Sequence, residues 1–216
     1  MSYTIESIAE CIGARRVGEC EATIDWLLTD SRSLSFPEET LFFALTTKRN
    51  SGARYIPDLY DRGVRNFVVT EEDFEKIKNG ELGKLSTLNF LIVANPLKAL
   101  QKLAEIHREE FKIPIIGITG SNGKTIVKEW LHQLLSPDRR IVRSPRSYNS
   151  QIGVPLSVWQ LNEEAELGIF EAGISEMGEM NALKRMIKPT IGILTNIGGA
   201  HQENFFSLQE KCMEKL

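Results

Sequence analysis

The chain has 216 residues, of which 42% are hydrophobic, enough for one large domain or two small ones with apolar cores. Its formal net charge of −3 argues against a general nucleic-acid binder, which normally carries a basic excess. The three cysteines, Cys11, Cys20 and Cys212, lack metal-ligand spacing and are expected to be reduced thiols, with one disulfide left open. The N-terminal stretch does not have the pattern of a signal peptide, and no stretch approaches the roughly 20 apolar residues of a membrane span. These features predict a soluble, cytoplasmic protein.

In the first half of the chain, short apolar runs alternate with helical patterns. A helix is expected over 4–13, because its apolar residues share one face, Thr4 can cap its start and Gly13 can end it. The further expected elements are a strand over 40–45, a helical stretch over 55–63, strands over 66–70 and 89–95, and a helix over 95–111. A new strand follows "KIP" at 112–114, so the predicted domains are 1–112 and 113–216.

The second half consists of alternating strands and helices. The expected strands cover 115–119, 140–144, 167–171 and 191–196, and the expected helices cover 124–136, 152–160, 178–187 and a last stretch from about 207. Such alternation predicts a parallel, doubly wound α/β sheet that binds ligands at the carboxyl ends of its strands. Lys124, Glu171 and His201 each come soon after such a strand. The predicted fold class is therefore α/β, with a small α/β domain followed by part of a mostly parallel domain that carries a phosphate loop.

The stretch "TGSNGKT" at 119–125 resembles a phosphate-binding loop between a strand and a helix. It departs from the Walker pattern because Ile118 stands where the first glycine is expected. Glycines let backbone N–H groups turn toward phosphates, and the start of the helix adds its positive dipole end. The residues expected to bind a nucleotide are Gly120, Ser121, Asn122, Gly123, Lys124, Thr125 and Ile126. The alternative is an ordinary glycine-rich turn in which Lys124 is a solvated helix lysine.

Four other stretches resemble, together with this loop, the Mur ligases of peptidoglycan synthesis. They are "TDSRSLSFPEETLFFAL" at 29–45, "SPRSYNSQIGVPLSVWQL" at 144–161, "FEAGISEMGEM" and "LTNIGGAHQENFFSLQEKCMEK". The resemblance covers essentially the whole chain and is greatest to the MurF type, which adds D-alanyl-D-alanine to a UDP-N-acetylmuramoyl-tripeptide. Several stretches resemble the form that is fused to an alanine racemase. The resemblance implies an ATP-dependent ligase that forms an amide through an acyl phosphate, with two Mg²⁺ ions between the anionic reactants.

The resemblance also implies a role for individual residues. Lys124 would bind the β- and γ-phosphates, and Thr125 and Glu171 would hold the first Mg²⁺. His201 would bind the second Mg²⁺, and Asn149 would orient the γ-phosphate or a metal-bound water. The ordinary alternatives are a strand-end carboxylate for Glu171, a structural histidine for His201 and a turn residue for Asn149.

Lys215 lies fourteen residues after His201, the offset at which the family has a lysine that reacts with CO₂ to form a carbamate. A carbamate is an anion that could support the second Mg²⁺, and its formation requires an uncharged amine. Lys215 is the penultimate residue, so a frayed, unmodified lysine is the alternative.

In the first domain, Ser31 and Arg32 of "TDSR" match the family's UDP-sugar signature, and an arginine suits a diphosphate. Ser51 and Ala53 stand where the family usually has an aspartate and a histidine, so no role is assigned to them. The family's third domain and the rest of its central domain are not in the sequence, so the chain alone is expected not to complete ligation.

Other functions stay open at this point. One is a sibling ligase of the same superfamily, such as another Mur enzyme or a folylpolyglutamate synthase, although "TDSR" argues against the folate enzyme. Another is a phosphotransferase or GTPase with a phosphate loop, against which the sequence lacks an N-K-x-D motif. The last is a binding-only module for a UDP-sugar or a nucleotide.

Overall fold

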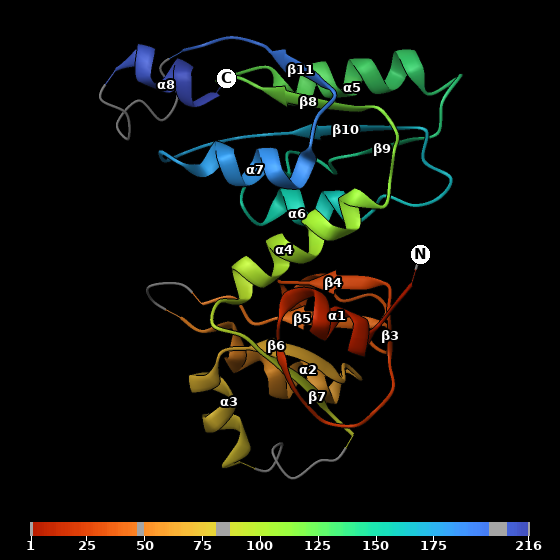
Figure 1. Ribbon diagram of the computed structural model, residues 1–216, viewed down its shortest axis with the longest axis vertical. Coiled ribbons are helices and arrows are strands. Elements are labelled where there is room, and N and C mark those ends of the chain that lie inside the picture. The colour runs from red at the N-terminus through yellow and green to blue at the C-terminus, as the bar shows by residue number, and fades with distance from the viewer. Residues whose placement is uncertain (1, 47–49, 81–86, 199–206, 216) are drawn as a thin grey trace. The chain divides into compact units, whose positions relative to one another are not determined.

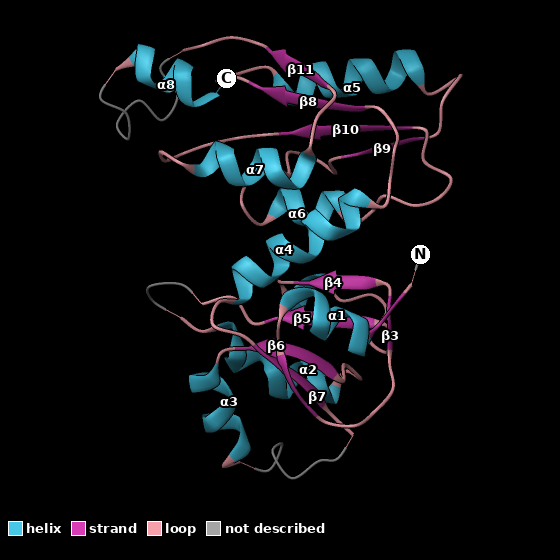
Figure 2. Cartoon of the chain, in the orientation of Figure 1, coloured by secondary structure: helices cyan, strands magenta, loops and turns pink. Residues whose placement is uncertain are grey.

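A computed structural model describes residues 2–46, 50–80, 87–198 and 207–215 of the chain. The chain forms two compact units, Met1–Leu103 and Ala104–Leu216. The division falls inside helix α4 (Pro96–Glu109), and the sequence-based assignment of domains to 1–112 and 113–216 stays a prediction. Each unit has its own sheet, drawn in Figures 1 and 2.

The first unit is built on a five-stranded sheet in the order β2-β7-β6-β5-β4, in which only β2 is antiparallel to its neighbour. The strands are β2 (Arg15–Val17), β4 (Trp26–Leu28), β5 (Thr40–Phe43), β6 (Asn66–Val69) and β7 (Asn89–Ile92). A separate antiparallel pair joins β1 (Tyr3–Thr4) and β3 (Thr23–Ile24). The helices are α1 (Ile5–Ile12), α2 (Ile56–Asp61) and α3 (Glu71–Lys78), with 3₁₀ turns at Ser31–Ser33 and Gly52–Tyr55.

The three central strands of this sheet are buried along their whole length, which agrees with the three apolar residues that follow the first, polar residue of each strand. Helix α1 begins where the Thr4 hydroxyl accepts a hydrogen bond of 3.1 Å from the Ser7 amide, and it ends at Gly13, which has a φ of 66°. The expected cap and stop residues of this helix are therefore confirmed.

The second unit has a four-stranded, fully parallel sheet in the order β11-β8-β10-β9. Its strands are β8 (Ile115–Thr119), β9 (Ile141–Arg143), β10 (Leu167–Glu171) and β11 (Ile191–Leu194). Its helices after α4 are α5 (Lys124–Leu135), α6 (Gly153–Val158), α7 (Glu179–Ile187) and α8 (Leu208–Lys215). Helix α5 covers one face of the sheet and α6 and α7 cover the other (Figure 1).

The mixed α/β architecture and the mostly parallel sheets confirm the predicted fold class. The elements that the patterns did not predict are the short strands β1 to β4 and helix α3. These strands have only two or three residues each, too few for an alternating pattern. Among the described residues, no helix is long and apolar enough to cross a membrane.

Candidate active site

The site lies at the carboxyl ends of two neighbouring parallel strands, β8 and β10. Their register places Glu171, the last residue of β10, beside Ile118, one residue before the end of β8. The loop 120–123 leads from β8 directly into α5. Parallel pairing thus brings the loop and the carboxylate together, although they are about fifty positions apart in the sequence.

Two glycines allow the loop to take its shape. Gly120 has a φ of 136°, and a Cβ atom on it would lie 2.0 Å from the Thr195 hydroxyl oxygen. Gly123, which precedes α5, has a φ of 81°. Both conformations are costly for residues with a side chain. The glycines at these two positions are therefore required by the backbone, as expected of a phosphate loop.

The segment that follows β11 packs directly on this loop. The Asn196 carbonyl oxygen accepts a hydrogen bond of 2.9 Å from the Ser121 amide, and the Asn196 side chain accepts one of 3.0 Å from the Asn122 amide. The Ser121 hydroxyl bonds to the backbone of Gly198. The amides of Ser121 and Asn122 therefore already have partners. The N–H groups in the first turn of α5, which lack partners within the helix, remain as the donors best placed for a phosphate.

Lys124, the first residue of α5, folds back over the loop. Its amine donates a hydrogen bond of 2.9 Å to the Gly120 carbonyl oxygen. Burial lowers the pKa of Lys124 below its usual range, and the nearby Glu171 carboxylate opposes that effect. Among the described residues, one backbone carbonyl thus holds the lysine beside the loop, and an incoming phosphate could take the place of this carbonyl.

Glu171 is fully buried and lies directly under this turn. One carboxylate oxygen, Oε2, accepts a hydrogen bond of 3.1 Å from the Thr125 hydroxyl. The other, Oε1, lies 3.0 Å from the Lys128 amine as an ion pair but has no partner with hydrogen-bond geometry. A hydroxyl beside a carboxylate with spare acceptor capacity fits the oxygen ligands that Mg²⁺ prefers. Among the described residues, no three His, Cys, Asp or Glu side chains cluster as a metal site.

A pocket of about 240 Å³ opens above the loop and gathers several of the predicted residues. Its lining includes Lys124, Asn149 and Lys215, together with Gly120, Ser121, Ser150, Gly173, Ile174 and Ser175. Lys215 is only 5% exposed, so it is packed against the pocket and not frayed. The structure therefore brings three residues from α5, α8 and the loop after β9 to one place. His201 lies outside the described residues.

Sequence reasoning missed two residues of this site. Lys128 is completely buried beside Glu171, although a lysine on a helix is usually solvated. The sequence feature that could have indicated this role is the position of Lys128, one helical turn after Lys124 and on the same side of α5. Asn196 binds the loop, but the residues around it in the sequence do not distinguish it from an ordinary turn residue.

In the first unit, Ser31 and Arg32 form a 3₁₀ turn that Asp30 caps. Arg32 is largely exposed and holds Asp30 through both carboxylate oxygens, at 2.9 and 2.6 Å. The hydrogen bonds from the Arg32 side chain lower the pKa of Asp30 to about 2. Ser31 is nearly buried, and its carbonyl oxygen accepts a hydrogen bond of 2.8 Å from Arg62. Arg32 is therefore accessible to a ligand, whereas Ser31 offers mainly its backbone position.

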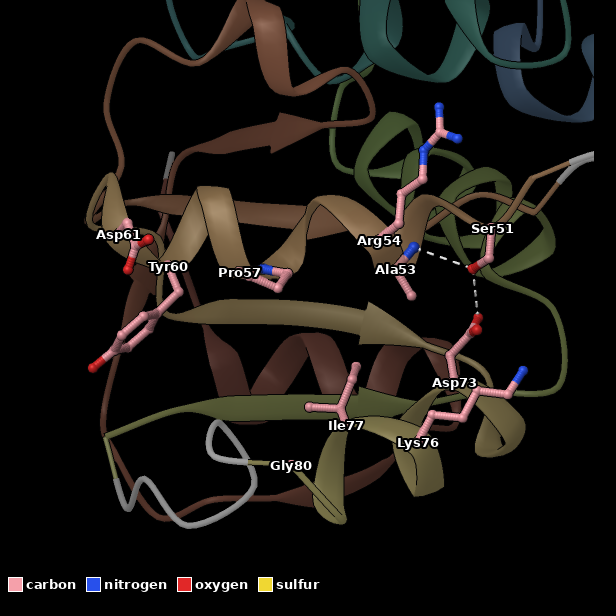
Figure 3. A pocket seen from close by; sticks show the side chains of 10 residues that line it. All are labelled: Ser51, Ala53, Arg54, Pro57, Tyr60, Asp61, Asp73, Lys76, Ile77 and Gly80. Atoms are coloured by element: carbon pink, nitrogen blue, oxygen red, sulfur yellow. Dashed lines mark hydrogen bonds between the residues drawn. The ribbon is translucent and has the colours of Figure 1, made fainter.

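An open pocket of about 870 Å³ lies elsewhere in the first unit, along α2 and α3 (Figure 3). Figure 3 shows the Ser51 hydroxyl between the Ala53 amide and the Asp73 carboxylate, with hydrogen bonds of 3.1 and 3.0 Å. Ser51 thus orders the turn that begins the lining of this pocket. Neither Ser31 nor Arg32 belongs to the lining residues described for it.

Known proteins with similar sequences cover both units of the chain. Residues 118–216 match the family model of the Mur ligase middle domain. Curated relatives named UDP-N-acetylmuramoyl-tripeptide–D-alanyl-D-alanine ligase occur in Treponema pallidum, 44% identical over 207 residues, and in Borreliella burgdorferi, 36% identical over 198 residues. These matches cover 93% and 90% of this chain but only 44% and 42% of the relatives. The chain therefore spans less than half the length of these relatives.

Solved structures give the same picture of the fold. The structure of MurF from Acinetobacter baumannii has a TM-score of 0.84 at 24% identity and covers all of this chain and 45% of that one. The MurF ligase from Thermotoga maritima, solved in complex with ADP, has a TM-score of 0.70 at 25% identity and covers 88% of this chain and 42% of that one. The folds of the two units are thus also found in these solved structures.

Proposed function

Because the chain belongs to the Mur ligase family, we propose that it carries the nucleotide site of a MurF-type ligase. The substrates would be ATP, a UDP-N-acetylmuramoyl-tripeptide and D-alanyl-D-alanine. The γ-phosphoryl group of ATP is transferred to the tripeptide carboxylate, which gives ADP and an acyl phosphate. The amine of D-alanyl-D-alanine then attacks the acyl carbon, phosphate leaves, and the nitrogen loses a proton as the amide forms. The relatives' shared name favours this reaction over that of a sibling Mur enzyme.

The chain's own residues would bind and orient the nucleotide. The first turn of α5 and the amine of Lys124 take the phosphates, and Thr125 and Glu171 hold Mg²⁺. A bound Mg²⁺ would supply positive charge that offsets the negative charge of the reactants. Asn149, which lines the same pocket, orients the terminal phosphate or a bound water. Ser31 and Arg32 take the UDP end of the sugar substrate.

In the complete proposed site, His201 and a carbamate on Lys215 would hold a second Mg²⁺. The support is the position of Lys215, which is buried against the pocket that also contains Lys124. In this reaction the neutral amine attacks CO₂, an N–C bond forms and one proton leaves. Chemical trapping in a polypeptide of the relatives' length should reveal the added CO₂ by mass, and a bare Lys215 would contradict the modification. Fusion to a racemase and the cytoplasmic location stay predictions.

One observation carries the proposal more than any other. The Thr125 hydroxyl contacts the carboxylate of Glu171 at the entrance of α5, under a loop whose two glycines have positive φ. An ordinary turn would have no need for a buried acidic side chain at this position.

The test is calorimetric binding of ATP in the presence of Mg²⁺. The wild-type chain should bind one nucleotide, and K124A should weaken the affinity roughly tenfold to a hundredfold, because a charge-assisted hydrogen bond is lost. The control is K112A, an exposed lysine in the same unit. In a polypeptide of the relatives' length, phosphate release should require all three substrates. Equal ATP binding by wild type and K124A would contradict the nucleotide site.

A further inference from the structure

Lys128 is one of the most deeply buried charged residues in the second unit. It lies in the middle of α5, and its side chain has no exposed surface. The amine donates a hydrogen bond of 2.8 Å to the Ser144 carbonyl oxygen and another to the Arg146 carbonyl oxygen. It also lies 3.0 Å from Glu171 and 3.3 Å from Glu129. Two of the three N–H donors of this ammonium group are thus used by backbone carbonyls, and the two carboxylates lie within ion-pair distance of it.

These partners come from different elements of the site. Glu171 ends β10, and the two carbonyl groups belong to the loop that follows β9 and leads to Asn149. Arg146 has a φ of 50°, which is uncommon for a residue with a side chain, and its carbonyl is one of those held by Lys128. A single amine thus joins the predicted metal carboxylate to the strained loop that carries another predicted site residue.

The far end of this loop is also anchored near Glu171. The Gly173 amide donates a hydrogen bond of 2.8 Å to the Asn149 carbonyl oxygen, just after β10. At the near end, the Ser144 hydroxyl accepts a hydrogen bond of 3.1 Å from the Glu171 amide. The loop 144–149 is therefore held at one end by Glu171 of β10, at the other by Gly173 just after β10, and in between by Lys128.

The buried pair of Lys128 and Glu171 is not well explained by a contribution to the stability of the fold. Burial of a lysine and a glutamate removes both from water, and their attraction often does no more than offset that cost. An apolar pair of similar volume could fill the same space. The buried pair is better explained by orientation, because the lysine binds Oε1 of Glu171 and leaves Oε2 facing the Thr125 hydroxyl.

We propose that Lys128 is a positioning residue of the Mg·ATP site, which fixes the orientation of Glu171 and holds the loop that carries Asn149. Lys128 is too deeply buried to touch the nucleotide itself. It acts through Glu171 and the loop that carries Asn149, as the outer partners of metal ligands generally act through those ligands. The inference rests on the proposed function, since it assigns the carboxylate of Glu171 to a metal.

The experiment compares wild type with K128M, which keeps the length of the side chain and removes its charge and donors. ATP affinity is measured by calorimetry with Mg²⁺ and with EDTA, and hydrogen exchange of 144–150 is measured without nucleotide. The ratio of ATP affinity with Mg²⁺ to ATP affinity with EDTA should be about tenfold to a hundredfold smaller in K128M than in wild type. This is the effect that loss of an outer partner of a metal ligand typically has. Exchange of the loop amides should become faster at the same time.

The matched control is R108M. Arg108 is also a buried cation bound to backbone carbonyl groups, those of Ile187, Phe111 and Lys188, but it contacts none of the site residues named above. R108M should lower the melting temperature without changing the Mg²⁺-dependent gain or the exchange of 144–150. This difference separates a positioning role from a contribution to stability alone.

K128Q provides a second variant if K128M does not fold. The amide keeps N–H donors for the loop but has no charge for Glu171, so it should lose the Mg²⁺-dependent gain more than the loop protection. Wild-type behaviour of the folded variants in both measurements would overturn the inference. Absence of Mg·ATP binding in the wild type would instead reject the proposed function, and unchanged exchange of 144–150 would then still overturn the role of Lys128 in the loop.

Discussion

Lys124 and Lys128 are one helical turn apart on α5, and the fold gives them different tasks. Lys124 lines the pocket, and its amine is bound to a single carbonyl of its own loop. Lys128 is enclosed by partners from β10 and from the loop that follows β9. The first lysine can therefore exchange its partner for a phosphate, whereas the second can only keep its neighbours in place.

His107 is a buried histidine whose protonation should control the stability of the second unit. Its Nε2 atom lies 3.0 Å from the Leu161 carbonyl oxygen, and its ring packs on Trp159 and Phe111. Burial lowers the pKa of His107 from 6.5 to about 4. The folded state therefore needs the neutral ring, with the Nε2 hydrogen donated to the carbonyl.

Since the unfolded chain binds this proton at a higher pH than the folded chain does, stability should fall as the pH drops. The contribution is complete above about pH 6.5 and is lost as the pH approaches 4. Its size is on the order of 3 kcal/mol. Denaturant unfolding between pH 7 and 4 measures it. H107Q should flatten this dependence and the control H132Q should keep it; an equally steep dependence in H107Q would contradict the assignment.

Among the elements of the second unit, α8 contacts the start of α7 through a side chain. Glu214 accepts hydrogen bonds of 2.9 and 3.1 Å from the amides of Gly178 and Met180. A carboxylate at the beginning of a helix satisfies N–H groups that lack partners and interacts favourably with the helix dipole. Glu214 is the chain neighbour of Lys215, so this contact helps to hold α8 where that lysine lines the pocket.

E214A should release α8 and expose the amine of Lys215. Loss of a capping interaction costs about 1 kcal/mol, so the chain should stay folded. Acylation of Lys215, followed by mass spectrometry, should become faster, and the amides of Gly178 and Met180 should exchange faster. Q209A alters an exposed position of the same helix and should change neither rate. Unchanged labelling of Lys215 in E214A would show that other contacts hold α8.

At the scale of the whole molecule, the two units should respond to different ligands. Mg·ATP should slow hydrogen exchange at 119–126 and 144–150 in the second unit and leave 51–80 in the first unit unchanged. UDP-N-acetylmuramoyl-tripeptide should protect amides around Ser31 and Arg32. Each ligand at a hundred times its dissociation constant should stabilise its own unit by about 2.7 kcal/mol. Protection by Mg·ATP that is confined to the first unit would contradict the assignment of the two sites.

The local sequence pattern was sufficient to predict most strands and helices of the second unit. Its four strands and its helices lie where the apolar periodicity predicted them, within two residues at most ends. The roles of the loop glycines and of the Thr4 cap could also be predicted, because they depend on the conformation of a few adjacent residues. Short strands such as Arg15–Val17 were missed because they gain their stability from pairing with a distant strand, β7.

The α/β class, the phosphate loop and the residues that resemble those of a ligase could be predicted from the sequence, since each of these depends on nearby residues and their order. Three contacts could be found only in the folded chain: Lys128 is buried against Glu171, Asn196 binds two amides of the loop, and Glu214 binds the start of α7. These contacts join residues between 34 and 75 positions apart. Their partners are chosen by strand order and helix packing, which no local pattern encodes.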